Sequence, residues 1–285
     1  MTTLATTTGI PTRVRPEAGS ISAIAAVGTL ARRRLSLTAR TPREIVVPLL
    51  TPIMFALVIA PALAKMVRSP ALDYKTFVAV GTVGLLVPLS CMFAGIGVIV
   101  DRDSGARREL LAAPVPRSLM VAGNFVVALA VSTLQLGALM LAATLRGAKF
   151  DTSAAGVAWF VAAAYLFAIA SYGIAEVMAN RIAKQEEYIG ATPAVAILPW
   201  FLAGALFPLH ALPGALAAIA KVLPLTHALA VMRYGLLDRH ATGLRDIWGM
   251  SSANGMAALS LAVVAAWAVV LSTAAVRVFA KSAVR

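Results

Sequence analysis

The stretch TFVAVGTVGLLVPLSCMFAGIGVIV, residues 76–100, decides the fold class. It is 25 residues long and contains no charged side chain. An α-helix rises about 1.5 Å per residue and the hydrocarbon core of a bilayer is about 30 Å thick, so about 20 apolar residues suffice to cross it. A run of this length and composition predicts a membrane-spanning helix.

Five further apolar runs lie on either side of this stretch, and none of them contains a charged residue. They cover residues 45–64, 119–145, 154–175, 188–207 and 255–276. Together the six runs predict an all-α integral membrane protein with six transmembrane helices, in one membrane domain over residues 45–276. The composition agrees, because 60% of the residues are hydrophobic and 13% are charged, whereas soluble domains are roughly 25% charged. This composition argues against a soluble enzyme, a disordered chain and a coiled coil.

Basic residues outnumber acidic ones, with 25 Lys and Arg against 12 Asp and Glu. Because the basic residues lie between apolar runs, we interpret them as topology signals and contacts to anionic lipids, and we expect no nucleic-acid partner. With six spans both termini lie on one side, and the larger share of the Lys and Arg falls there. This bias predicts a multi-pass protein of the cell membrane with both termini in the cytoplasm. We expect a flexible cytoplasmic tail at residues 1–20 and a cytoplasmic C-terminal tail at residues 277–285.

Residues 21–40 form an amphipathic segment before the first span. On a helical wheel one arc is apolar, and the opposite arc holds Arg32 and Arg33. Arg34 falls inside the apolar arc, so its side chain would have to extend toward the lipid headgroups. The pattern favours a helix that lies on the membrane surface. The alternative is a soluble amphipathic helix that packs on a partner.

Residues 101–118, DRDSGARRELLAAPVPRS, connect the second and third spans and predict a short cytoplasmic helix. Asp103 or Ser104 can cap its N-terminus, and Pro114 ends it. Its two adjacent leucines are flanked by charges in a loop that has no domain of its own to bury them, which indicates docking on another protein. The candidate contact residues of this loop are Arg107, Arg108, Glu109, Leu110, Leu111, Pro114, Val115 and Arg117.

Residues 208–237 are apolar but interrupted. Pro213 and Pro224 divide them into residues 214–223 and 225–237, and each piece is shorter than the roughly 20 residues that a bilayer requires. We therefore expect a pair of re-entrant or interfacial helices on the outer side, covered by protein where their backbone is irregular.

The common sequence signatures of catalysis are missing from the chain. It contains no G-x-x-x-x-G-K-[ST] phosphate loop, so we expect no ATP site, no cofactor and no enzymatic activity of its own. Its single Cys91 excludes a zinc site built on several cysteines. His210, His227 and His240 could hold zinc on the outer side. Because no carboxylates stand near them at ligand spacing, we interpret them as ordinary interfacial histidines.

Two other classes of membrane protein stay open at this point, a secondary transporter and an integral-membrane enzyme. Either would need ionisable or catalytic side chains inside the spans, and the six runs contain no charged residue and no histidine. Glu176 comes nearest, just past the fourth run, and we interpret it as a carboxylate that reaches the cytoplasmic headgroups. The pattern favours a conduit for a lipophilic substrate, with energy supplied by a separate partner.

Three motifs in order resemble those of type-2 ABC exporter permeases of the daunorubicin-resistance kind. The first is RELLAAPVPR at residues 108–117, and the second is LPWFLAGALFPLHALPG at residues 198–214. The third begins with PLTHAL at residues 224–229 and ends at Arg233. Asn124 departs from the pattern, because the family often has a basic residue there.

The resemblance implies a six-helix permease in which residues 21–40, with Arg32, Arg33 and Arg34, are an elbow helix. It implies that a coupling helix within residues 101–118 inserts into a cytoplasmic ABC ATPase subunit, and that this partner binds ATP and Mg²⁺. It also implies a second permease chain, identical or related, and export of a lipophilic or amphiphilic substrate such as a drug, lipid or glycolipid. The residues that it assigns to the outer hairpin and the substrate pathway are Pro199, Gly204, Pro208, Pro213, Pro224 and Arg233.

Overall fold

The computed structural model describes residues 22–59, 61–62, 74–238 and 240–282, and the predicted tail at residues 1–20 lies outside them. Within these ranges every regular element is helical, so the all-α prediction is confirmed for them. The elements are α1 (Ala23–Arg40), α2 (Arg43–Met54), the π-helix η1 (Phe55–Ile59), α4 (Tyr74–Asp103), α5 (Ala106–Ala112), α6 (Arg117–Leu145), α7 (Ala154–Arg181), α8 (Gln185–Leu202), the short 3₁₀-helix η2 (Leu209–Ala211), α9 (Gly214–Ala220), α10 (Pro224–Leu236), α11 (Thr242–Trp248) and α12 (Ala253–Ser282).

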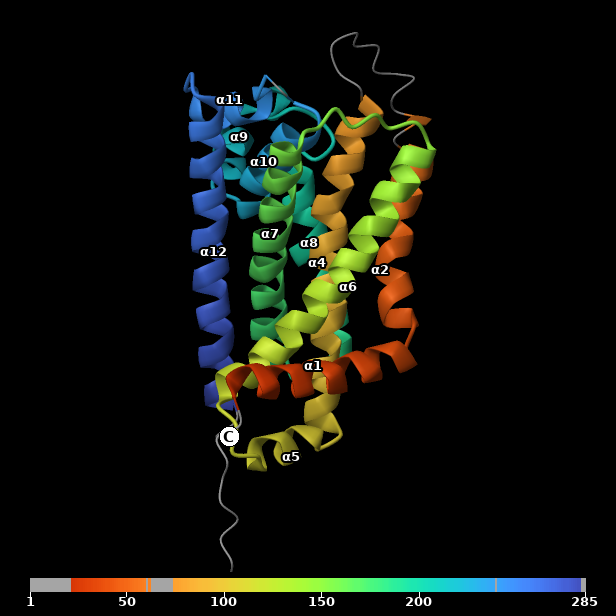
Figure 1. Cartoon of the computed structure of the whole chain (residues 1–285), viewed down its shortest axis with the longest axis vertical. Helices are drawn as coiled ribbons and strands as arrows, with labels where there is room; N and C mark the ends of the chain where they lie inside the picture. The colour runs from red at the N-terminus through yellow and green to blue at the C-terminus, as the bar shows by residue number, and fades with distance from the viewer. Residues whose placement is uncertain (1–21, 60, 63–73, 239, 283–285) are drawn as a thin grey trace, which may run out of the picture.

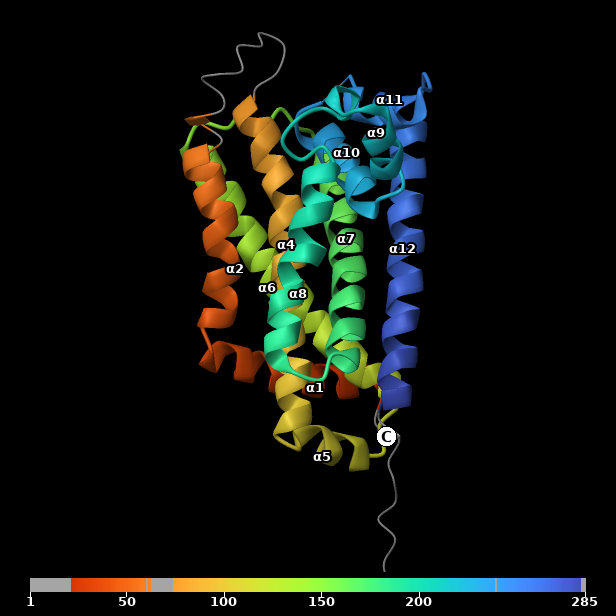
Figure 2. The same cartoon turned by 180° about the vertical axis from the view of Figure 1, so that it is seen from behind.

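The long helices form a bundle with two different ends (Figure 1 and Figure 2). Helix α4 is the most buried of them and contacts α7, α6, α2 and α8. Helix α1 lies across one end of the bundle, and α5 protrudes beyond it, close to the end of α12. Helices α9, α10 and α11 gather at the opposite end. We call these the α5 end and the hairpin end.

Four helices, α4, α6, α7 and α12, are long and apolar enough to cross a membrane. Two bent helix pairs raise this number to six if each pair is one span: α1 with residues 45–59, bent by 74°, and α9 with α10, bent by 83°. Helix α8 is not in this set, because its first turn carries Glu186 and Glu187. It ends at Leu202, five residues before the predicted run 188–207 does, because Gly204 turns the chain with a φ of 72°. The described residues thus hold four to six candidate spans.

The last helix is longer than the apolar run that predicted it. Residues 277–282, which were expected to belong to a tail, continue α12 to Ser282. Lys281 lies in the last turn, where a cation interacts favourably with the helix dipole. Phe279 is buried against Met120 and Val121 at the start of α6. The extension therefore brings the end of α12 beside the predicted loop helix.

Helices α7 and α10 approach each other through two glycines. A Cβ added to Gly156 would overlap the carbonyl oxygen of Gly235, and one added to Gly235 would overlap that of Gly156. Thr152 also donates a 2.7 Å hydrogen bond from its hydroxyl to the Gly235 carbonyl. Small residues allow such close backbone contact between membrane helices.

We expect Gly235→Ala to lower the free energy of unfolding in detergent by about 1–3 kcal/mol, the usual cost of overpacking. The matched control is Gly137→Ala on α6, where an added Cβ meets nothing within 4 Å. That change should leave stability equal or raise it by about 0.5–1 kcal/mol, since glycine is a poor helix former. Thermal unfolding of both purified variants measures the difference, and equal midpoints would contradict a tight α7–α10 contact.

Candidate functional site

Helix α5 begins after a left-handed glycine. Gly105 has a φ of 80° and occupies the N-cap position without any side-chain cap, so the predicted capping by Asp103 or Ser104 is wrong. Glycine adopts this conformation at no steric cost, which lets the chain reverse sharply between α4 and α5. The helix ends at Ala112, two residues before Pro114.

Arg107 anchors α5 to the end of α12. Its guanidinium carbon lies 4.6 Å from the centre of the Phe279 ring. The same group donates to the Phe279 carbonyl oxygen at 3.3 Å and to the Ser282 hydroxyl oxygen at 2.6 Å. Burial lowers the pKa of the Arg107 guanidinium, and the negative charge of Glu176 partly opposes this shift. The loop helix is therefore attached to the bundle of its own chain.

Leu110 and Leu111 are half-buried, which corrects the expectation that nothing in this chain covers them. They pack against Met120, Val121 and Phe279, because the start of α6 and the end of α12 lie beside α5. The outward side of the loop is mainly polar. Among the contact residues predicted for this loop, those exposed are Arg108, Glu109, Pro114 and Arg117. Val115 is half-buried.

Arg34 does not extend toward headgroups as predicted. Its side chain is 9% exposed and donates to the carbonyl oxygens of Gly97 at 3.0 Å and Ala94 at 3.2 Å, and to the Asp101 carboxylate at 3.4 Å. A Cβ on Gly97 would overlap the guanidinium, so this glycine makes room for it. Arg33 pairs with the other carboxylate oxygen of Asp101 at 3.2 Å. Two of the three consecutive arginines of α1 thus hold this helix on α4, while Arg32 stays exposed.

A chain of hydrogen bonds runs from α5 into the bundle. Arg107 donates to Ser282, which donates to the Asn180 side-chain oxygen at 3.1 Å. Asn180 donates to one carboxylate oxygen of Glu176 at 3.1 Å, and Tyr172 donates to the other at 2.8 Å. Glu176 is fully buried, so our interpretation of it as a headgroup contact is wrong. Its spacing of four residues from both Tyr172 and Asn180, one helical turn, was a signal that sequence reasoning missed.

At the hairpin end, Arg233 is buried beneath the turn that follows α8. It donates to the carbonyl oxygens of Gly204 at 2.8 Å and Ala205 at 2.7 Å. Its guanidinium carbon lies 3.4 Å from the centre of the Phe77 ring, in a cation–π contact. The cation thus satisfies two backbone carbonyl groups of the turn that follows α8.

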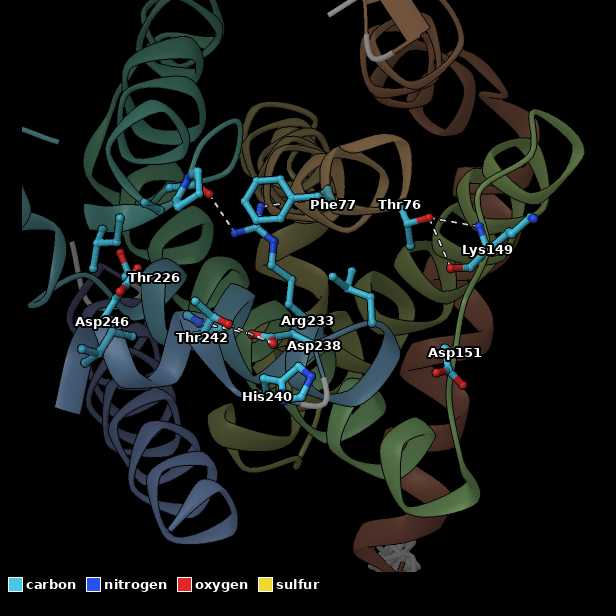
Figure 3. A pocket seen from close by; sticks show the side chains of 18 residues that line it. Thr76, Phe77, Lys149, Asp151, Thr226, Arg233, Asp238, His240, Thr242 and Asp246 are labelled. Atoms are coloured by element: carbon cyan, nitrogen blue, oxygen red, sulfur yellow. Dashed lines mark hydrogen bonds between the residues drawn. The ribbon is translucent and has the colours of Figure 1, made fainter. Parts of the chain in front are cut away.

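A cavity of about 450 Å³ opens beside Arg233 (Figure 3). Its lining comes from α4, the α6–α7 connection, the turn after α8, helix α10, the α10–α11 connection and helix α11. No local sequence pattern indicates it, because these segments are far apart in the chain. Its main polar and aromatic lining residues are Phe77, Lys149, Thr226, Arg233, Asp238 and Asp246.

Some of the residues predicted for the outer hairpin and the substrate pathway line this cavity, and the others lie elsewhere. Arg233, Gly204 and Pro208 line it. Pro213 directly precedes α9 and Pro224 is the first residue of α10, a position where proline is favoured because its missing N–H has no helical partner. Pro199 lies inside α8, as the motif predicted.

The family model described as ABC-2 type transporter matches residues 25–237, from α1 to the turn after α10. The chain belongs to the ABC-2 type transporter family. Membrane domains of this family lack an ATP site of their own and work with an ABC ATPase. This ABC-2 domain is accordingly the permease component of an ABC transporter. A search of curated proteins finds no match to the chain.

The histidines of this ABC-2 permease are placed separately. His210 Nδ1 lies 2.9 Å from the Asp246 carboxylate, and His227 Nε2 lies 2.9 Å from the Lys221 carbonyl oxygen. His240 lines the cavity. In the part of the chain that the structure describes, no three His, Cys, Asp or Glu side chains are grouped as a metal site.

Proposed function

We propose that this chain is the permease subunit of an ATP-driven exporter of the daunorubicin-resistance-like kind. It moves a lipophilic or amphiphilic substrate, such as a drug, a lipid or a glycolipid, out of the cytoplasm or the inner leaflet. ATP and Mg²⁺ are bound by a separate cytoplasmic ABC ATPase subunit. The α5 end faces the cytoplasm, with both termini, and the hairpin end faces outward.

The observation that carries this proposal is the division of α5 into an attached side and an exposed side. Arg107, Leu110 and Leu111 hold the helix on α6 and α12, while Arg108 and Glu109 point away from the bundle. A helix held in this way can pass a movement of a docked partner to the spans. We therefore assign α5 as the coupling helix and α1, which lies across the same end, as the elbow helix.

Apolar side chains on the outside of the bundle support contact with membrane lipids and with a second permease chain. Leu50 on α2, Leu134 on α6 and Val269 on α12 are exposed in the single chain. In the proposed dimer the substrate enters from the bilayer, along a path between the two chains that includes Pro199 on α8.

Burial of Glu176 and Arg34 removes one argument against a secondary transporter, because ionisable groups do lie inside the bundle. Both groups have hydrogen-bond partners. The family match supports the permease over this class and over an integral-membrane enzyme, because it assigns the chain to the membrane component of an ABC transporter.

We expect the purified, partner-free chain not to bind ATP at micromolar concentrations, because it contains no phosphate loop. The complex with its ABC ATPase should hydrolyse ATP, and the transported substrate should stimulate this activity. Isothermal titration and a phosphate-release assay measure the two properties. The control is a complex whose ATPase lacks its phosphate-loop lysine. Micromolar ATP binding by the partner-free chain would contradict the proposal.

A further inference from the structure

Two small voids lie inside the α5 end of the bundle, and the side chain of Asn124 lines both of them. The outer void, of about 30 Å³, lies where α1, α4, α5, α6 and α12 meet. The inner void, of about 20 Å³, lies further along α4 and α6, where these helices adjoin α1 and α7. Since one side chain belongs to both walls, the two voids are neighbours.

Asn124 places an amide in the apolar run of α6. Within the described ranges this amide has no hydrogen-bond partner, and both of its polar atoms keep accessible surface. Gln135, the other amide of this helix, is fully buried and is bonded to the Ser90 hydroxyl and the Ile45 carbonyl oxygen. Because amides inside proteins are nearly always paired, the partners of Asn124 belong in the voids.

The hydroxyl of Thr38 on α1 is in the same situation. Thr38 is 7% exposed and lines the inner void. In the part of the chain that the structure describes, its hydroxyl is unpaired, although the oxygen keeps accessible surface. Arg34, in the same wall, already donates to the carbonyl oxygens of Ala94 and Gly97. Thr38 and Asn124 therefore present unused donors and acceptors to the inner void.

The volumes limit the ligand to the size of water. A bound water requires about 10–15 Å³ of such space and roughly two to four polar partners. The polar residues of the inner wall are Arg34, Thr38, Ser90, Asn124 and Tyr172. Those of the outer wall are Arg33, Asp101, Arg107 and Asn124. Both voids meet the two requirements, and neither can admit a lipid headgroup or a drug.

We propose that both voids hold ordered water, and that these waters, joined through Asn124, form a hydrated path from the α5 end into the bundle. The path ends at Tyr172, whose hydroxyl donates to the buried carboxylate of Glu176. Buried water of this kind is part of the structure, because it completes hydrogen bonds that the protein leaves open.

Synchrotron radiolysis of the full chain in lipid nanodiscs tests the hydration. X-rays convert bound water into hydroxyl radicals, which oxidise adjoining side chains where radicals from the bulk cannot reach, and mass spectrometry locates the oxidation. Tyr172 and Tyr188 are 1% and 0% exposed, and Tyr172 alone of the two lines the inner void. Phe279 and Phe160, 6% and 7% exposed, are the corresponding pair for the outer void. We expect oxidation of Tyr172 and Phe279 to exceed that of their controls. Equal oxidation within both pairs would overturn the proposal.

Variants at Asn124 locate the waters. Asn124→Leu keeps the approximate size and removes the amide, so we expect about fivefold weaker water binding and a similar fall in Tyr172 oxidation, the effect of one neutral hydrogen bond. Asn124→Ser should retain the oxidation, because a hydroxyl can both donate and accept. The matched control is Ala130→Leu, which adds a leucine at an exposed position of α6. Unchanged Tyr172 oxidation in Asn124→Leu, or an equal fall in Ala130→Leu, would overturn the proposal. If Asn124→Leu does not fold, the comparison of Tyr172 with Tyr188 in the wild-type chain still decides.

Exchange of chloride for gluconate in the buffer separates water from a small anion, which the neighbouring arginines could attract. We expect the oxidation of Tyr172 and Phe279 to be independent of the anion. A rise on removal of chloride would show that an anion occupies the voids and would overturn the proposal. Because these measurements need neither ATP nor a partner, their failure is distinguishable from failure of the proposed ATPase coupling.

Discussion

Exchanging the two charges on the outward side of α5, in the variant Arg108→Glu with Glu109→Arg, is expected to uncouple the permease from its ATPase. Both side chains are exposed, and neither makes an ion pair within the described part of the chain. The exchange keeps the net charge and should not affect folding. An interface anchor typically contributes about 2 kcal/mol or more, so we expect roughly thirtyfold weaker association with the ATPase.

Association is measured by titrating the reconstituted permease with its ATPase, together with substrate-stimulated hydrolysis and export. Membrane abundance and thermal unfolding should stay at the wild-type level. Arg245→Glu on α11 is the control, because this residue is exposed at the hairpin end. Wild-type coupling of the exchanged variant would indicate that α5 only reverses the chain.

Replacing Arg34 by leucine is expected to cause the largest loss of stability. The change leaves the Asp101 carboxylate, which is 14% exposed, without its more buried partner. It also leaves the extra hydrogen bonds to Ala94 and Gly97 unmade. Breaking a buried ion pair by removing one partner costs about 3–5 kcal/mol. Denaturant unfolding in detergent should show a loss of this size.

Arg33→Leu provides the comparison on the same carboxylate. The Arg33 side chain is 36% exposed, and pairs of this kind contribute about 0–1 kcal/mol. The double variant Arg34→Leu with Asp101→Leu should recover part of the stability, because no buried charge is then left unpaired. A loss below about 1 kcal/mol for Arg34→Leu would mean that water or lipid headgroups solvate the guanidinium.

Most of the helical elements could be predicted from the sequence. The uncharged runs at 76–100, 119–145, 154–175 and 255–276 each lie within one long helix of the structure. Pro213 and Pro224 marked the starts of α9 and α10. These predictions depend on properties of each residue and its neighbours, namely apolar side chains and a missing N–H, so a local sequence suffices for them. Helix α11 was missed, because a helix of seven residues leaves too short a periodic pattern.

The candidate sites required the tertiary structure. The helical wheel placed Arg34 correctly on an apolar arc, but its partners, Gly97 and Asp101, come more than 60 residues later. Glu176 directly follows an uncharged run in the sequence, yet the fold encloses it, and the hairpin-end cavity gathers residues from six segments. By itself, the sequence determined the all-α membrane class, the short helix within residues 101–118 and the broken hairpin, because these follow from local composition and backbone chemistry. Only the tertiary structure decided which polar groups are buried and paired, because desolvation and hydrogen bonding depend on residues that meet only when the helices pack.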